Sequence, residues 1–352
     1  MVSEKVLRSA SNKTVLIVNK NIDSINIVLM LFSFIAALMH PFELFLFSYI
    51  ILGPLHYMTE LSWLKERNFF THTASIWPVL LIIGLSIVGL IILIDLDHTL
   101  GLVDYAQTTE VYISRVLIAL IAATFFLSYF LNKPTQRGIL IGIGLIAFAI
   151  GLFLSSNFYF SLIIGILIPT LIHTTLFTGA FILDGALKSR STIGFLSFIV
   201  FVVCNMLFFL LPDIDGRLLS NPYVQNIFLE GDFFRLNQGV NSIIYSISDA
   251  FVLDSPNGLR IQGFIAFAYT YHYLNWFSKT EIIKWYKVPQ GQLILSIVIW
   301  ILSITLHLIN VKVGIMFIAL LSMLHVIMEF PLNHRSFVSI GGSIAGLLRP
   351  NR

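Results

Sequence analysis

Residues 192–212 read TIGFLSFIVFVVCNMLFFLLP, an apolar stretch without a single charged side chain. A helix of this length spans about 30 Å, which is the thickness of the hydrocarbon core of a bilayer. Strands that cross a membrane are only about ten residues long and alternate between apolar and polar side chains. The continuous stretch therefore predicts a transmembrane helix, and similar stretches recur along the chain.

The composition of the whole chain excludes a soluble protein. Of its 352 residues, 57% are hydrophobic and only 11% are charged, whereas a soluble domain carries about 25% charged residues. The low fraction of charged residues also excludes a disordered protein and a nucleic-acid-binding module. The single cysteine, Cys204, excludes a disulfide within the chain. We therefore expect an all-α fold, a polytopic bundle of transmembrane helices.

Windows of about 17–25 predominantly apolar residues mark ten predicted spans. They are residues 24–40, 42–63, 75–94, 111–131, 138–155, 160–183, 192–212, 261–277, 293–310 and 314–333. The predicted transmembrane domain thus covers residues 24–333, between a leader at 1–23 and a tail at 334–352. The connection at 213–260 is long enough to contain helices of its own and to form a lid, a re-entrant segment or an outer cap.

The distribution of cations predicts the orientation of these spans. When the connections are assigned alternately to the two sides, sixteen of the 21 Lys and Arg residues fall on one side and four on the other. The cation-rich side is cytoplasmic by the positive-inside rule. The sequence therefore predicts a multi-pass protein of a bacterial plasma membrane with both termini in the cytoplasm. The loop at 213–260 is then external, and the lipid bilayer is the first expected partner.

Four histidines lie inside even-numbered predicted spans: His56, His173, His272 and His325. All four spans are predicted to run from the outside inwards. Each histidine lies seven to eleven residues before a charged residue near the inner end of its span. At 1.5 Å per residue they share one slab in the cytoplasmic half of the bundle. Placing an ionisable side chain inside a membrane costs several kcal/mol of free energy. The four histidines are therefore candidates for a functional site.

Two of these histidines have a carboxylate one helical turn further on, since Glu60 follows His56 and Glu329 follows His325 by four residues. Residues at i and i+4 share a helix face, and imidazole with carboxylate is a common set of metal ligands. We therefore predict a metal centre made of the four histidines, Glu60 and Glu329. Further candidates for ligands or for side chains that orient them are His334, His72, Asp184, Tyr271 and Asn275.

The ligand types favour non-haem iron, with zinc or manganese as alternatives, because no thiolate is available in the cluster. A metal in an apolar bundle suits a lipid-soluble substrate, such as a fatty chain or an isoprenoid, that enters from the bilayer. The expected function is an oxygenase or another oxidoreductase, and the catalytic residues are not assigned. A zinc-dependent lipid hydrolase and a proton-coupled transporter that uses the same residues as a relay are the alternatives.

The segment Gly53-Pro54-Leu55-His56 with Glu60 resembles a motif of the integral-membrane carotenoid-cleaving oxygenases of the Brp/Blh type. Tyr57 and Leu61 stand where that family has glycine and a second histidine. The resemblance covers this stretch and the scatter of histidines along the chain. It implies one iron ion held by histidines from separate membrane helices.

Overall fold

The computed structural model describes residues 22–67, 168–211, 222–231, 233–245, 253 and 255–348, and within these ranges the protein is helical without a strand. The first helix covers Ile22–Met39. The elements that follow are α2 (Pro41–Phe47), the π-helix η1 (Ser48–Leu52), α3 (Gly53–Glu66), α8 (Ile168–Leu171), the π-helix η3 (Ile172–Phe177), α9 (Thr178–Ser189), α10 (Thr192–Leu210), α11 (Pro222–Glu230), α12 (Phe234–Tyr245), α13 (Pro256–Ser278), α14 (Thr280–Ile283), α15 (Gln290–Ile309) and α16 (Val311–Leu348).

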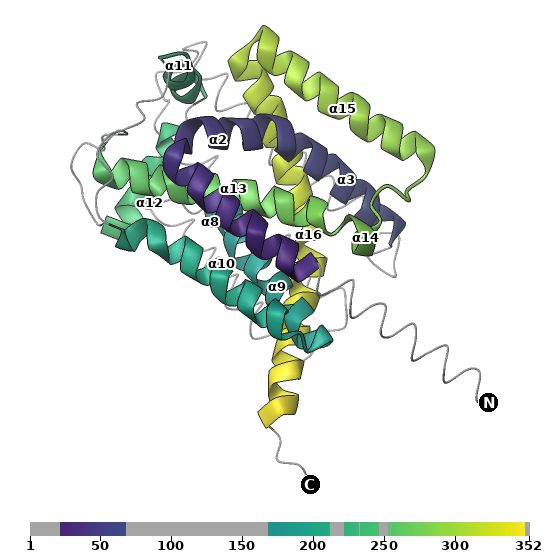
Figure 1. The fold of residues 1–352 in the computed structure, drawn as a ribbon. Coiled ribbons are helices and arrows are strands. Elements are labelled where there is room, and N and C mark those ends of the chain that lie inside the picture. The colour runs from purple at the N-terminus through teal and green to yellow at the C-terminus, as the bar shows by residue number, and fades with distance from the viewer. Residues whose placement is uncertain are drawn as a thin grey trace, which may run out of the picture.

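Helix α13 is the centre of the bundle (Figure 1). Its residues from Ile261 to Tyr273 are all buried, so no side of this stretch faces solvent or lipid. A helix that is buried all round is typical of the core of a large bundle. Gly263 allows close packing here, because a Cβ at this position would lie 2.9 Å from the ring of Phe208. Ser255 caps the helix by accepting a hydrogen bond from the backbone N–H of Gly258.

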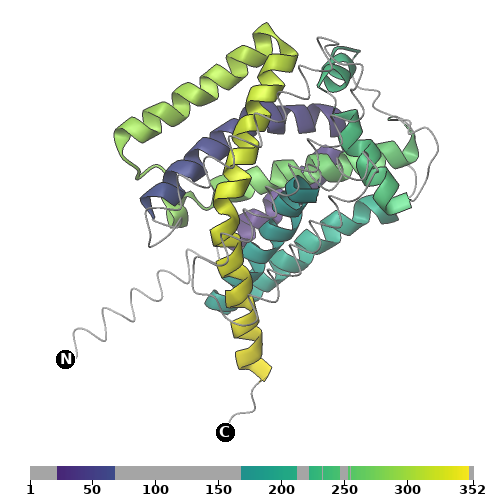
Figure 2. The same ribbon diagram turned by 180° about the vertical axis from the view of Figure 1, so that it is seen from behind.

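Contacts between helices fix their relative directions. The segment α2–η1–α3 runs parallel to α13, since Ser48 bonds Thr270 at one end and Trp276 bonds Thr59 at the other. Helix α15 runs antiparallel to α3, because Ser62 bonds Ser296 whereas Trp300 bonds the carbonyl of Ile51. Helix α16 follows α15 as the second arm of a hairpin (Figure 2). Helices α3 and α13 therefore share one direction, and α16 leads back from the far end of α15.

Helix α9 has the same direction, because it forms a hairpin with α10 and α10 packs antiparallel to α13. Phe201, early in α10, contacts Tyr271, whereas Phe208, late in α10, contacts Phe267. The turn between α9 and α10 passes through Arg190, whose φ of 52° is in the left-handed region. The four helices that carry the predicted histidines are not all parallel, since α16 crosses α13 in Figures 1 and 2.

The predicted external connection contains helices, which is one of the alternatives that its length allows. Helix α11 and the residues that follow it place Phe228 and Phe233 against Phe42 and Phe45 of α2. Buried amides hold α12 on α13, since Asn237 donates a 3.0 Å hydrogen bond to Gln262, which donates one of 3.0 Å to the carbonyl oxygen of Pro41. This part of the chain packs onto the bundle as an apolar cap.

Among the described residues, four helices are long and apolar enough to cross a membrane: Ile22–Met39, Pro41–Glu66, Thr192–Leu210 and Gln290–Ile309. Each matches a predicted span. Three more predicted spans, at 160–183, 261–277 and 314–333, fall on α8–α9, α13 and α16 where residues are described. The spans predicted at 75–94, 111–131 and 138–155 lie outside the described residues. Helix α16 does not end at 333 but continues to Leu348.

Candidate metal centre

A widened helical turn stands before His56 and another contains His173. In η1 the N–H of Gly53 bonds the carbonyl of Ser48, five residues back. Pro54 has no N–H to continue the α-helical pattern, and its ring crowds the preceding turn, which favours such a π-turn. In η3 the hydroxyl of Thr174 bonds the carbonyl of Thr170 at 3.1 Å, and side-chain bonds of this kind compete with the helix ladder. Turns of this type are frequent at functional sites.

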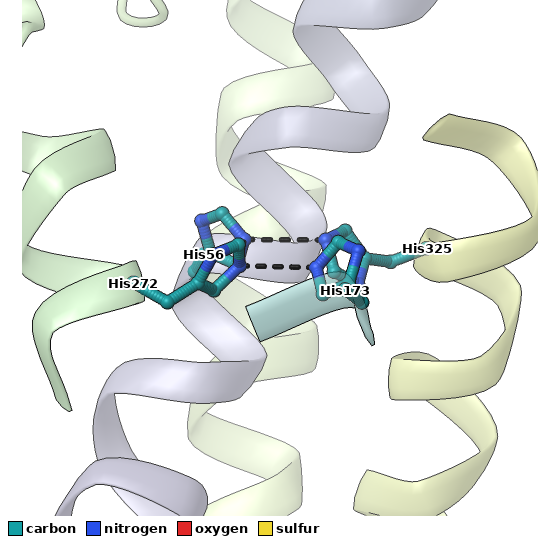
Figure 3. Close-up of side chains that lie close together, drawn as sticks. All are labelled: His56, His173, His272 and His325. Carbon is teal, nitrogen blue, oxygen red and sulfur yellow. Dashed lines mark hydrogen bonds between the residues drawn. The ribbon is translucent and has the colours of Figure 1, made fainter. Parts of the chain in front are cut away.

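The four predicted histidines meet at one point in the bundle (Figure 3). The Nε2 atom of His56 lies 3.2 Å from Nε2 of His325 and 3.1 Å from Nε2 of His272. The Nε2 atom of His272 lies 3.0 Å from Nε2 of His173. All four ligand atoms lie within 4.8 Å of one another. Four helices that are distant in the sequence thus contribute one nitrogen each to a common centre.

Both predicted carboxylates belong to the same cluster. Glu60 Oε2 lies 3.1 Å from Nε2 of His56 and 3.1 Å from Nε2 of His325, so it points at the centre. Glu329 Oε2 lies 2.8 Å from Nδ1 of His173, on the far side of that ring. The six side chains are between 0% and 5% exposed. The four histidines could therefore hold a metal ion, and so could the group formed by Glu60, His325 and Glu329. Glu329 also faces the imidazole of His173 and could orient it.

The Nδ1 contact of His325 indicates which nitrogen of this imidazole carries the proton. The Nδ1 atom of His325 lies 3.4 Å from the carbonyl oxygen of Ser322, which can only accept a hydrogen bond. A neutral imidazole that donates from Nδ1 has its lone pair on Nε2. The Nε2 atom of His325 therefore presents its lone pair to the centre, as a metal ligand does. The Nδ1 atom of His173 lies 2.8 Å from Glu329 Oε2, but the two atoms do not have hydrogen-bond geometry.

The two carboxyl groups of the cluster are buried among imidazoles. Among the described residues, the ion-pair partners of Glu60 and Glu329 are histidines alone. An ionised carboxylate in an apolar bundle is unfavourable unless it is paired or binds a metal. A divalent cation held by these residues would balance the charge of ionised carboxylates.

Three more residues lie around the centre, and of these Thr178 and Tyr57 were not predicted as part of it. Thr178 Oγ1 lies 2.7 Å from Nδ1 of His272. The ring of Tyr57 stacks on His325 with centroids 4.7 Å apart. Its hydroxyl bonds that of Tyr273 at 2.5 Å. The rings of the two tyrosines thus pack against the imidazoles, and Thr178 orients His272.

The further predicted candidates lie in other surroundings. Tyr271 donates a 3.3 Å hydrogen bond to Asn26. Asp184 pairs with Lys188 at 2.6 Å. Asn275 is buried one turn after His272, and His334 follows Glu329 by five residues on α16. His72 lies outside the described residues. None of the four described residues has a contact with the four histidines among those that the structure records.

Comparisons with known proteins identify no relative. No protein-family model matches the chain, and no curated protein or solved structure matches it either.

Proposed function

We propose that this protein is an integral-membrane oxygenase with a non-haem iron ion held by His56, His173, His272, His325 and Glu60. The observation that carries the proposal is the convergence of four buried Nε2 atoms with neighbouring separations of 3.0–3.2 Å. A helix-to-helix hydrogen bond needs two polar side chains. Four imidazoles and two carboxylates at one point are what a metal ion needs.

The spacing of the nitrogens favours one class of metal. Two nitrogens that are each about 2.1 Å from an ion lie about 3.0 Å apart at a right angle and about 3.4 Å apart at the tetrahedral angle. Two of the three separations, 3.0 and 3.1 Å, lie nearer to the right-angled value. Right angles belong to five- and six-coordinate centres, whereas structural zinc is almost always tetrahedral. This supports iron or manganese, and with it a redox function more than hydrolysis by zinc-bound water.

The surroundings of the centre support a lipid-soluble substrate. Aromatic rings pack against the histidines, among them Tyr57, Tyr273 and Trp276. The outward side of α15 exposes large apolar side chains, which suits contact with lipid. A bound iron ion supplies oxygen activation, and the chain's own residues hold it, exclude water and leave an apolar surface for a hydrocarbon chain or isoprenoid. Membership of the Brp/Blh-type oxygenases is part of this proposal.

Metal analysis of the detergent-purified protein tests the proposal. We expect about one iron per chain after expression in iron-replete medium, and an optical or electron paramagnetic resonance signal of high-spin iron after oxidation. Tightly held zinc that iron does not displace would instead support the hydrolase, and a folded protein that binds neither metal would refute the metal centre. Consumption of dioxygen with isoprenoid or fatty-chain substrates then tests the reaction class.

A further inference from the structure

The possible metal ligands of the cluster form two overlapping sets. The imidazole set contains one nitrogen from each of the four histidines, and these atoms all lie within 4.8 Å of one another. The carboxylate set obeys the same limit and consists of Glu60, His325 and Glu329. The two sets have only His325 in common. An ion among the four imidazoles therefore does not by itself account for the two carboxylates.

Glu329 faces away from the middle of the imidazole set. Its Oε2 atom lies 2.8 Å from Nδ1 of His173, whereas Nε2 of this ring faces the other histidines. That oxygen is buried and has no hydrogen-bond partner among the described residues, although Asn333 forms a side-chain hydrogen bond with the same carboxyl group. An ionised carboxylate that is buried without a partner is unfavourable, and a bound cation removes this cost.

Glu60 lies at the border between the two sets. Its Oε2 atom is 3.1 Å from Nε2 of His56 and 3.1 Å from Nε2 of His325, and Glu60 is also a member of the carboxylate set. A carboxylate has two oxygens and can bind one ion with each of them. The ions of catalytic sites with two metals lie about 3.5–4 Å apart, which one carboxylate can bridge. Glu60 is therefore placed to join two neighbouring ions.

We propose that the cluster holds a second divalent cation beside the first, bound by Glu329 and bridged to the first ion by Glu60. This inference rests on the proposed metal centre. The lone pair on Nε2 of His325 serves the ion among the imidazoles, so the second ion takes its ligands from the two carboxylates and from water. Oxygen ligands of this kind favour hard divalent cations such as Mn²⁺ over Zn²⁺.

The second cation should bind more weakly than the first. The first ion has four imidazoles around it, whereas the second has two protein side chains and shares one of them with its neighbour. Two divalent cations also bring four positive charges to two carboxylates, and like charges this close repel each other. The protein is therefore expected to retain one ion through purification and to take up the second when free metal is added.

Mn²⁺ binding by the metal-free, detergent-solubilised full chain tests the second site by electron paramagnetic resonance. The signal of free Mn²⁺ gives the number of ions bound, and two neighbouring bound ions give a spin-coupled spectrum that a single ion does not. We expect the wild type to bind two Mn²⁺ with this coupled spectrum, the second ion with a dissociation constant about tenfold higher or more.

Glu329→Gln should bind one Mn²⁺ and lose the coupled spectrum, because the second ion loses the ligand that it does not share. The matched control is Glu43→Gln on α2, which removes a half-buried carboxylate outside the cluster. This control should still bind two ions with the coupled spectrum.

Saturation of the wild type at one Mn²⁺ per chain would overturn the second site and leave the histidine centre intact. Two bound ions without spin coupling would also overturn it, and so would a coupled pair in Glu329→Gln. If Glu329→Gln does not fold, the stoichiometry and spectrum of the wild type still decide. Failure of the wild type to bind Mn²⁺ or Fe²⁺ at all would refute the proposed metal centre instead, so the two failures are distinguishable.

Discussion

The Nε2 atoms of His173 and His272 lie 3.0 Å apart although 99 residues separate the two histidines in the chain. The two histidines belong to different helices. Their contact is between the Nε2 atoms, which face the centre of the cluster. Thr178 and Glu329 hold the opposite nitrogens of these two rings. In this pair, each imidazole points one nitrogen at the common centre and has a neighbouring side chain at its other nitrogen.

Removal of one imidazole from the centre should abolish tight metal binding. We expect His272→Ala to retain less than about a tenth of the wild-type metal, because the ion loses a ligand and His173 loses its neighbour. Inductively coupled plasma mass spectrometry on the folded variant measures this. His307→Ala is the matched control, since His307 is a buried histidine of α15 outside the cluster. Equal metal in both variants would contradict the assignment.

We expect the loss of the Glu329 carboxylate to weaken metal binding less than the loss of a direct ligand does. Its carboxylate faces Nδ1 of His173, and such partners typically contribute 10–100-fold in affinity. We expect Glu329→Gln to weaken binding by about 10–100-fold in competition with a chelator, and Glu60→Gln to weaken it more. Glu43→Gln on α2 controls for the loss of a half-buried carboxylate outside the cluster and should leave the affinity unchanged. A Glu60→Gln variant with wild-type affinity would show that Glu60 is not a ligand.

Thr178→Val removes the hydroxyl that holds Nδ1 of His272 and keeps the shape of the side chain. The imidazole then loses its orienting partner, so we expect metal affinity to fall by about tenfold or more. Thr175→Val is the control, because the hydroxyl of Thr175 bonds the carbonyl of Leu171 in its own helix. Equal affinities of the two variants would mean that Thr178 does not orient His272.

The place of Thr178 could not be predicted from the sequence, for a geometric reason. In an α-helix, a residue five positions after His173 points about 140° away from it. The widened turn η3 brings position i+5 back to the same face, so His173 and Thr178 both reach His272. The pairing of carboxylate with histidine, in contrast, follows the ordinary i, i+4 rule. Glu60 and Glu329 were predicted because their helices are regular there.

The meeting of the four histidines agrees with the common depth that the sequence predicts for them. That prediction takes the direction of each span from the distribution of cations and converts distance from the inner end into depth by the helix rise. The extension of α16 to Leu348 was not predicted, since Arg335 marks the predicted end of a span and not the end of a helix. Tyr57 was not predicted as part of the site, because the sequence does not show which neighbouring ring its side chain packs against.

The contact between α15 and α16 depends on Gly314. A Cβ at this position would overlap the backbone of His307, and overpacking of this kind costs about 1–3 kcal/mol. We therefore expect Gly314→Ala to lower the thermal unfolding temperature. Gly341→Ala in the same helix has open space around it and should be neutral or slightly stabilising, since alanine favours helices. A Gly314→Ala protein as stable as Gly341→Ala would contradict the close approach.

X-ray absorption spectroscopy of the iron-loaded protein tests the central claim most directly, because the scattering from imidazole rings counts the histidines bound to the metal. The account predicts one iron with about four imidazoles and an oxygen ligand, with metal–nitrogen distances of about 2.1 Å. A centre with two or fewer imidazoles, or iron bound only at the protein surface, would contradict it.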